Sequence, residues 1–168
     1  MDTSDDLRFD RTFDGGDRTP GRLRRQLSRL LGMTSAQASR VAAEALAPLG
    51  AHKAHFVVLA VLAEGGPASQ SAIADRARVY RSDLVAVLNE LAEGGWIVRA
   101  PDPADKRRNT ITITGAGRAR LAEIEAVLDG ANDRIMAPLS EAERAQLFSL
   151  LGRVNAHLAS GGGASPAP

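Results

Sequence analysis

A run of three cations, Lys106-Arg107-Arg108, is the segment whose side chains suggest the clearest chemistry. It follows Pro101-Asp102-Pro103, a sequence that forbids regular structure. Guanidinium and ammonium groups at the tip of a hairpin suit contact with a phosphate backbone or a minor groove. Many basic hairpins are only solvated, so the elements that precede this run decide its interpretation.

Two strand-like segments flank the cations. Residues 96–99 read Trp-Ile-Val-Arg, and residues 110–114 alternate threonine with isoleucine. Alternation with a period of two is typical of a half-buried strand. The sequence therefore predicts a two-stranded hairpin with the cations at or near its tip.

Three helices are predicted before the hairpin. Residues 51–64 form a mostly apolar helix, which ends at Gly65-Gly66-Pro67. A short helix begins with Ser69 as its N-cap and runs to about Ala77. The next helix covers roughly residues 80–94 and ends at a pair of glycines.

The last of these helices has one apolar and one small, polar face. Its apolar stripe has helical spacing and consists of Leu84, Val87, Leu88 and Leu91. The opposite face carries Ser82, Ala86 and Asn89, with Val85 at its edge and Arg78 and Arg81 at its amino end. A small outer face flanked by cations suits insertion into a major groove. Helix, turn, helix and hairpin together predict a winged helix-turn-helix, mainly α with a small two-stranded β wing.

The order of these elements over about residues 22–158 resembles the MarR family of bacterial transcription regulators. Its most specific part is the wing, where an aspartate, a basic residue and an arginine precede a Thr-x-x-Gly-like end; Asp105 and Arg107 match that pattern. The resemblance implies that Arg107 reaches the minor groove while Asp105 holds its guanidinium. The implied recognition-helix contacts are Arg78, Tyr80, Arg81, Ser82, Asp83, Val85, Ala86 and Asn89. The implied phosphate contacts at the preceding helix start are Ser69, Gln70 and Ser71, and those of the wing are Asp105, Lys106, Arg107 and Arg108.

Tyr80 and Ala86 depart from the family pattern, and Asp83 adds an acid to the first turn of the recognition helix. Tyr80 replaces a small capping residue, so this helix lacks a side-chain N-cap. Ala86 stands where a basic or polar residue is common, which leaves contact with thymine methyl groups as its available role. Asp83 favours the helix dipole but repels phosphate, so we expect it to face a base edge or Arg81.

Composition narrows the classes of protein that remain. The chain has 168 residues, enough for one domain with a real core, and a net charge of only +1. Residues 76–120 hold nine cations against five acids, a net of +4, whereas residues 121–168 hold three against six, a net of −3. There is no cysteine, which excludes disulfides and thiolate metal sites. The absence of an apolar run of about 20 residues and of a signal peptide predicts a cytoplasmic protein with no membrane contact.

The ends of the chain predict a dimerisation region. Residues 21–50 are helical, with a possible bend at Gly32 to Ser35, and two further helices cover 118–159, the last opened by a Ser140–Glu143 capping box. These helices hold more apolar surface than one domain can cover, so we expect a homodimer; a monomer with internally packed helices is the alternative. The winged helix-turn-helix lobe is 51–117, residues 1–20 are expected to form a mobile arm, and 160–168 a disordered tail.

A small effector, aromatic or anionic, is implied by the family resemblance. The candidate pocket residues are Arg25, His52, His55 and Phe56. A histidine at a helix start is more often a surface or hydrogen-bonded residue, and arginines of the first helix are more often solvated. His52 and His55 lie one turn apart, but no cysteine or third histidine is near, so the sequence predicts neither a metal site nor a cofactor.

The sequence bears on three possible functions. The leading one is a dimeric, ligand-responsive repressor that binds double-stranded DNA at a pseudo-palindromic operator. The alternative is a winged-helix protein-interaction module, which Ala86 and Asp83 favour. An enzyme is not expected, because no nucleophile elbow, phosphate loop or paired carboxylate motif is present.

Overall fold

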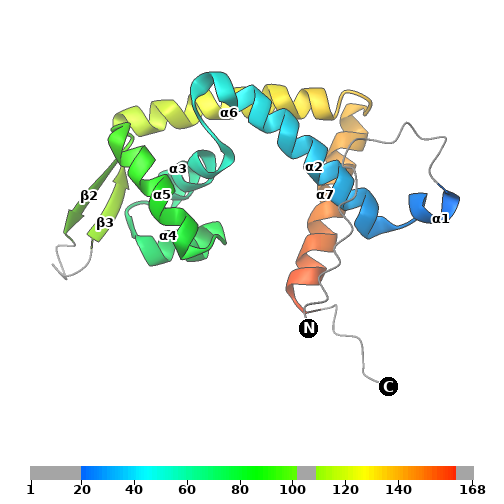
Figure 1. Cartoon of the computed structure of the whole chain (residues 1–168), viewed down its shortest axis with the longest axis horizontal. Helices are drawn as coiled ribbons and strands as arrows, with labels where there is room; N and C mark the ends of the chain where they lie inside the picture. The colour runs from blue at the N-terminus through cyan, green and yellow to red at the C-terminus, as the bar shows by residue number, and fades with distance from the viewer. Residues whose placement is uncertain (1–19, 102–108, 162–168) are drawn as a thin grey trace, which may run out of the picture. The chain divides into compact units, whose positions relative to one another are not determined.

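A computed structural model describes residues 20–101 and 109–161, and within them helices dominate (Figure 1). In chain order the elements are α1 (Gly21–Arg24), α2 (Leu27–Leu46), the 3-10 helix η1 (Ala47–Leu49), α3 (Lys53–Gly65), β1 (Ala68–Ser69), α4 (Gln70–Ala77), α5 (Arg81–Glu93), β2 (Ile97–Pro101), β3 (Asn109–Ile113), α6 (Gly115–Ile135) and α7 (Glu141–Ala159). The predicted class, mainly α with a small β wing, is confirmed.

Local sequence accounts for the limits of α4 and α5. The Ser69 hydroxyl accepts a hydrogen bond from the Ala72 amide, and Arg78 ends α4 in the left-handed conformation. Tyr80 makes no side-chain cap at the start of α5, as the sequence predicts. The chain leaves α5 through Gly94 and then Gly95, whose φ of +71° suits a residue without a β-carbon.

The wing belongs to a sheet of three strands, not two. The order is β1-β3-β2 and all pairs are antiparallel; Ala68 pairs with Ile111, and Ile97 pairs with Ile113. The prediction missed β1 because two residues are too few to show an alternating pattern. Pro101 was wrongly expected to lie outside regular structure: it ends β2 opposite Asn109, on an edge strand, where a missing N–H breaks no ladder.

The core of the lobe lies beneath the sheet and between α3, α4 and α5. The predicted apolar stripe of α5 is buried throughout. It packs in one cluster with the inward side chains of α3, α4 and the strands; the fully buried members include Leu59, Leu62, Ile73, Leu88, Leu91, Ile97 and Ile111. Burial of this continuous apolar set fixes α5 in place and leaves its other face to solvent.

The N-terminal helices differ from the prediction in one respect. The helix is not split at Gly32 to Ser35, because α2 is continuous through these residues, and the break falls at Arg25 and Gln26 instead. One glycine weakens a helix interior by only about 1 kcal/mol relative to alanine. Pro48 in η1 and Gly50, with a φ of +57°, then turn the chain into α3.

The chain divides into two compact units between Ala131 and Asn132. In the second unit, the predicted capping box at the start of α7 is present: Ser140 and Glu143 satisfy each other's backbone amides. No residue of α7 is buried. The predicted dimerisation region, 21–50 with 118–159, stays a prediction.

Within the described ranges, no single helix is both long and apolar enough to cross a membrane. The segment Leu27–Leu49 and α3 meet both criteria only as a pair, with a 79° bend between them.

Candidate nucleic-acid interface

The outward face of α5 is the centre of the candidate interface. Ser82, Asp83, Ala86 and Asn89 are exposed, and Val85 is 45% exposed. Tyr80, just before the helix, is 81% exposed, more than any other large hydrophobic side chain among the described residues. The side chain of Arg81 lies outside what the structure describes. The face is therefore shallow and mostly free of bulk, apart from Tyr80 at its amino end.

Two polar contacts shape this face. The Arg99 Nη2 atom of β2 donates to Asn89 Oδ1 across 2.7 Å, a charge-assisted bond that joins the wing to the recognition helix. The Ser82 hydroxyl donates to Asp83 Oδ1 across 3.0 Å. Arg99 could not be predicted from the sequence, because no local pattern relates a strand residue to a helix residue ten positions earlier.

The start of α4 presents a second part of the interface. The Ser69 and Ser71 hydroxyl oxygens lie 3.0 Å apart, and Ser69 caps the helix. Arg78, which ends the same helix, is exposed, whereas Ser69, Gln70 and Ser71 are half-buried. Free amides at a helix start attract phosphate oxygens, and Ser69, Gln70 and Ser71 stay the predicted phosphate contacts.

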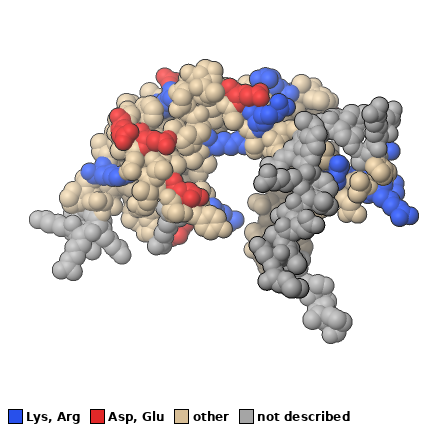
Figure 2. All heavy atoms as spheres, viewed as in Figure 1, with Lys and Arg blue, Asp and Glu red and all other residues tan. Residues whose placement is uncertain are grey.

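Asp105, Lys106, Arg107 and Arg108 lie outside the described residues; Pro101 and Asn109 mark the ends of the strands that carry them. Figure 1 shows β2 and β3 extending from the lobe on the side away from α2. In Figure 2, acidic and basic side chains are interspersed over the visible face of the lobe, without one continuous basic surface.

The base of the wing is held by contacts of residues 114–117. The Thr114 hydroxyl donates to the Gly95 carbonyl across 2.8 Å and accepts from the Gly117 amide across 2.9 Å. A β-carbon on Gly117 would lie 2.0 Å from the Trp96 carbonyl oxygen. Only glycine permits this approach, which fixes the hairpin against the start of α6.

A cluster of two histidines and one glutamate joins the start of α3 to the last turn of α5. His52 Nε2 donates to Glu90 Oε2 across 2.9 Å, and His55 Nε2 donates to the same oxygen across 2.8 Å. Burial lowers the pKa of His55, although its bond to Glu90 opposes this effect. The hydrogen bonds from His52 and then His55 lower the pKa of Glu90. Glu90 was missed from sequence because it lies 35 residues after His55.

Trp96 and Arg120 complete the surroundings of this cluster. The Trp96 ring is edge-on to His55 at 6.1 Å, and the Arg120 guanidinium lies 4.8 Å from the Trp96 centroid. Arg120 also donates to the Leu49 carbonyl and to Glu123 Oε2.

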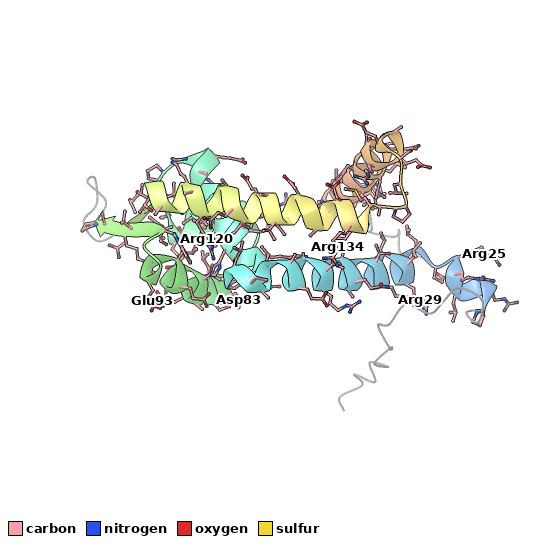
Figure 3. All side chains as sticks on the ribbon, turned by 90° about the horizontal axis from the view of Figure 1, so that it is seen from above. Arg25, Arg29, Asp83, Glu93, Arg120 and Arg134 are labelled. Carbon is pink, nitrogen blue, oxygen red and sulfur yellow. The ribbon has the colours of Figure 1, made fainter. Side chains whose placement is uncertain are left out.

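The four predicted pocket residues are only partly brought together. Phe56, on α3, packs half-buried against the core beside the histidines. Arg25 precedes α2 and His52 follows it, so about 30 Å of helix separates them. Figure 3 shows Arg25 beyond the end of α2 that is farthest from Arg120.

Comparison with known proteins identifies the family. Residues 50–108 match the model of the MarR family. A putative transcriptional regulatory protein for the hcr operon of Thauera aromatica is 41% identical over 99 residues, which cover 59% of this chain but only 60% of that protein. An HTH-type transcriptional repressor of Mycobacterium tuberculosis is 30% identical over 107 residues, covering 64% of this chain and 77% of the repressor. The chain belongs to the MarR family.

A solved MarR-type structure agrees with the assignment. The transcriptional repressor CouR, bound to a 23-mer DNA duplex, is 28% identical with a TM-score of 0.74, over 80% of this chain and 96% of that one. The three similar proteins named above are regulators of transcription rather than enzymes.

Proposed function

We propose that this MarR-family protein is a repressor that binds a pseudo-palindromic DNA operator as a homodimer. The observation that carries the proposal is the two-sided character of α5: its apolar stripe is fully buried, and its exposed face is small and polar. A helix with a shallow outer face enters a major groove without steric conflict. The bond between Arg99 and Asn89 ties that helix to the wing, so both reach DNA as one body.

The outer face suggests how bases are read. Val85 and Ala86 offer methyl groups, which suit contact with thymine. Asn89 is already engaged by Arg99, so its amide is oriented, and Arg99 adds a cation beside it. Most affinity is then expected from phosphate contacts by the arginines near α5 and by the wing.

Dimerisation through terminal helices is supported by their exposed apolar side chains. Leu27 and Leu30 of α2 are exposed, and so is a stripe along α7 with helical spacing. That stripe consists of Leu147, Leu150, Leu151, Val154 and Leu158. A second copy would cover these faces, and a two-fold dimer would present two recognition helices about one DNA turn apart.

We further propose that a small effector, aromatic or anionic, relieves DNA binding by this cytoplasmic regulator. His52, His55 and Phe56 are the candidate contacts, and Glu90 joins the histidines to α5. A molecule bound there would act directly on the recognition helix. It would weaken DNA binding if it favoured a helix position that the operator does not.

The wing assignment is tested by fluorescence-anisotropy titration of operator DNA with Arg107→Ala. Loss of a phosphate or groove contact is expected to weaken binding by about 1 kcal/mol or more. Arg153→Ala, which removes an exposed cation from α7, serves as the matched control and should leave affinity unchanged. Wild-type affinity for Arg107→Ala would refute the role of the wing.

Salt dependence separates this function from a protein-interaction module. Displacement of counterions makes DNA affinity fall steeply as salt rises. An interface based on apolar contacts would show little dependence on salt, and that result would favour the module.

A further inference from the structure

We propose that His52, His55 and Glu90 form a binding site for a divalent first-row transition-metal ion, with Zn²⁺ the ion that suits the donors best. The three side chains come from two elements: the N-cap and third residue of α3, and the last turn of α5. Their ligand atoms all lie within 4.8 Å of one another. The site itself does not depend on the proposed function.

The donor atoms of the three side chains suit zinc. Two imidazole nitrogens and one carboxylate oxygen are ligands that zinc takes together, with water in the fourth position. Imidazole donors favour transition metals over Mg²⁺ or Ca²⁺, which prefer oxygen alone. The absence of cysteine from the chain leaves nitrogen and oxygen as its only strong metal ligands.

The separations between the ligand atoms are close to those of a tetrahedral zinc site. In a tetrahedral shell with bonds of about 2.0–2.1 Å, ligand atoms lie roughly 3.3 Å apart. The two histidine-to-glutamate separations are 2.9 and 2.8 Å, so each must lengthen by only a few tenths of an ångström. The two rings are already close, with centroids 3.8 Å apart and planes tilted by 32°, and both turn Nε2 toward the same carboxylate oxygen.

The exposure of the three side chains leaves the site open to solvent on one side. The His55 side chain is 4% exposed and forms the floor of the site, whereas those of His52 and Glu90 are about half exposed, at 48% and 51%. A metal ion therefore has access from solvent, and one coordination position remains open to water. Among the described residues, His55 Nδ1 is buried without a hydrogen-bond partner, and the polar contact of that ring is made by Nε2, the ligand atom.

An ion at this site would link two parts of the lobe that matter for the proposed function. Its ligands would tie the start of α3 to the end of the recognition helix. Because both attachment points are fixed, α5 would lose freedom to shift between positions. This regulatory consequence rests on the proposed function, and we expect occupancy to change operator affinity.

Trp96 supplies a built-in reporter for the test. It is the single tryptophan of the chain, and its ring lies 6.1 Å from that of His55. Untagged full-length protein, freed of metal by chelation, is titrated with Co²⁺ while tryptophan fluorescence and the visible absorption of Co²⁺ are recorded. The site predicts saturable quenching with one equivalent, together with the absorption of a low-coordinate Co²⁺ ion, both reversed by Zn²⁺.

Matched variants localise the binding. Glu90→Gln keeps an oxygen that accepts hydrogen bonds from the histidines but removes the charged ligand, and His52→Ala removes an exposed ligand without disturbing the core. Each is expected to lower metal affinity by at least about tenfold, as loss of even a supporting partner does. His157→Ala, at the end of α7, should bind like wild type. Equal affinity in all variants, or no saturable binding to the wild type, would overturn the proposal and leave Glu90 as a hydrogen-bond acceptor only.

The DNA arm is measured separately. Operator affinity of wild type and Glu90→Gln is compared with and without Zn²⁺, and only the wild type is expected to respond. Metal binding without any DNA binding would refute the proposed function but not the site. DNA binding that ignores Zn²⁺ in a protein that binds it would remove the regulatory consequence alone.

Discussion

The helix-turn-helix lobe and the terminal helix α7 differ in what covers their apolar side chains. In the lobe, the stripe of α5 is buried against α3, α4 and the sheet, and small or polar residues face solvent. In α7 no residue is buried, and six large hydrophobic side chains are exposed. Both helices are well formed, so the difference lies in packing and not in secondary structure.

The contrast lies in whether one chain alone covers the apolar side chains of each region. The lobe can hold its shape within one chain, and its exposed face is available for DNA. Large exposed apolar surfaces on a soluble chain mark interaction sites. The exposed apolar face of α7 is the surface that the proposed homodimer would cover, with a second copy of the chain related by two-fold symmetry.

The largest expected effect comes from breaking the core of the lobe. Leu88 is fully buried, and Leu88→Ala should lower the free energy of unfolding by about 2–5 kcal/mol, because a cavity replaces packed methyl groups. Urea unfolding followed by circular dichroism measures the change. Val85→Ala, in the same helix but on its exposed face, should change stability by no more than about 0.5 kcal/mol. Equal effects of the two substitutions would contradict the burial pattern.

The next effect should appear only in the oligomeric state. Leu151 lies within the exposed stripe of α7, and Leu151→Ala is expected to weaken dimerisation by about 2 kcal/mol, or roughly 30-fold. Sedimentation equilibrium at several concentrations gives the dissociation constant. Ser149→Ala, on the opposite face of the same helix, is the control. A monomeric wild type would exclude the dimer altogether.

A smaller effect on stability is expected from the N-caps of α4 and α5 within the lobe. Ser69→Ala removes the N-cap of α4 and should destabilise the protein by about 1 kcal/mol. Tyr80→Ser supplies the cap that α5 lacks and should stabilise it by about 0.5–1 kcal/mol. Thermal unfolding distinguishes the two signs. Destabilisation by Tyr80→Ser would mean that the exposed tyrosine has a structural role.

The smallest effect concerns pH and the start of α7. Hydrogen bonds from the Ser140 hydroxyl and amide lower the pKa of Glu143 below its usual 4.5. The capping box therefore adds stability above about pH 4.5 and loses it as the pH falls through the lowered value. The stability difference between wild type and Glu143→Gln should narrow from pH 6 to pH 3 in urea titrations. A difference that stays constant with pH would show that the carboxylate charge does not matter there.

Local sequence predicts most of the fold of the lobe. The stripe of α5, the cap at Ser69 and the glycine pair after α5 each depend on residues within one or two turns. Such features are readable because helical spacing and capping are local properties. The capping box of α7 belongs to the same class and is confirmed.

The features that sequence did not predict depend on contacts between distant segments. Glu90 meets His55 across 35 residues, and Arg99 meets Asn89 only after the chain has turned from helix to strand. The strand β1 has two residues and exists only because β3 lies beside it. The unbroken α2 shows that one glycine does not decide a helix when its neighbours favour helical structure.

Specific operator binding by the lobe is measured by a gel-shift titration with DNA flanking the coding sequence of this protein. The titration is carried out at low and at moderate salt with nonspecific competitor present. A regulator that reads DNA through this lobe should bind a palindromic site saturably, and the affinity should fall steeply as salt rises. Absence of specific binding at both salt concentrations, repeated with sites selected from the whole genome, would contradict it.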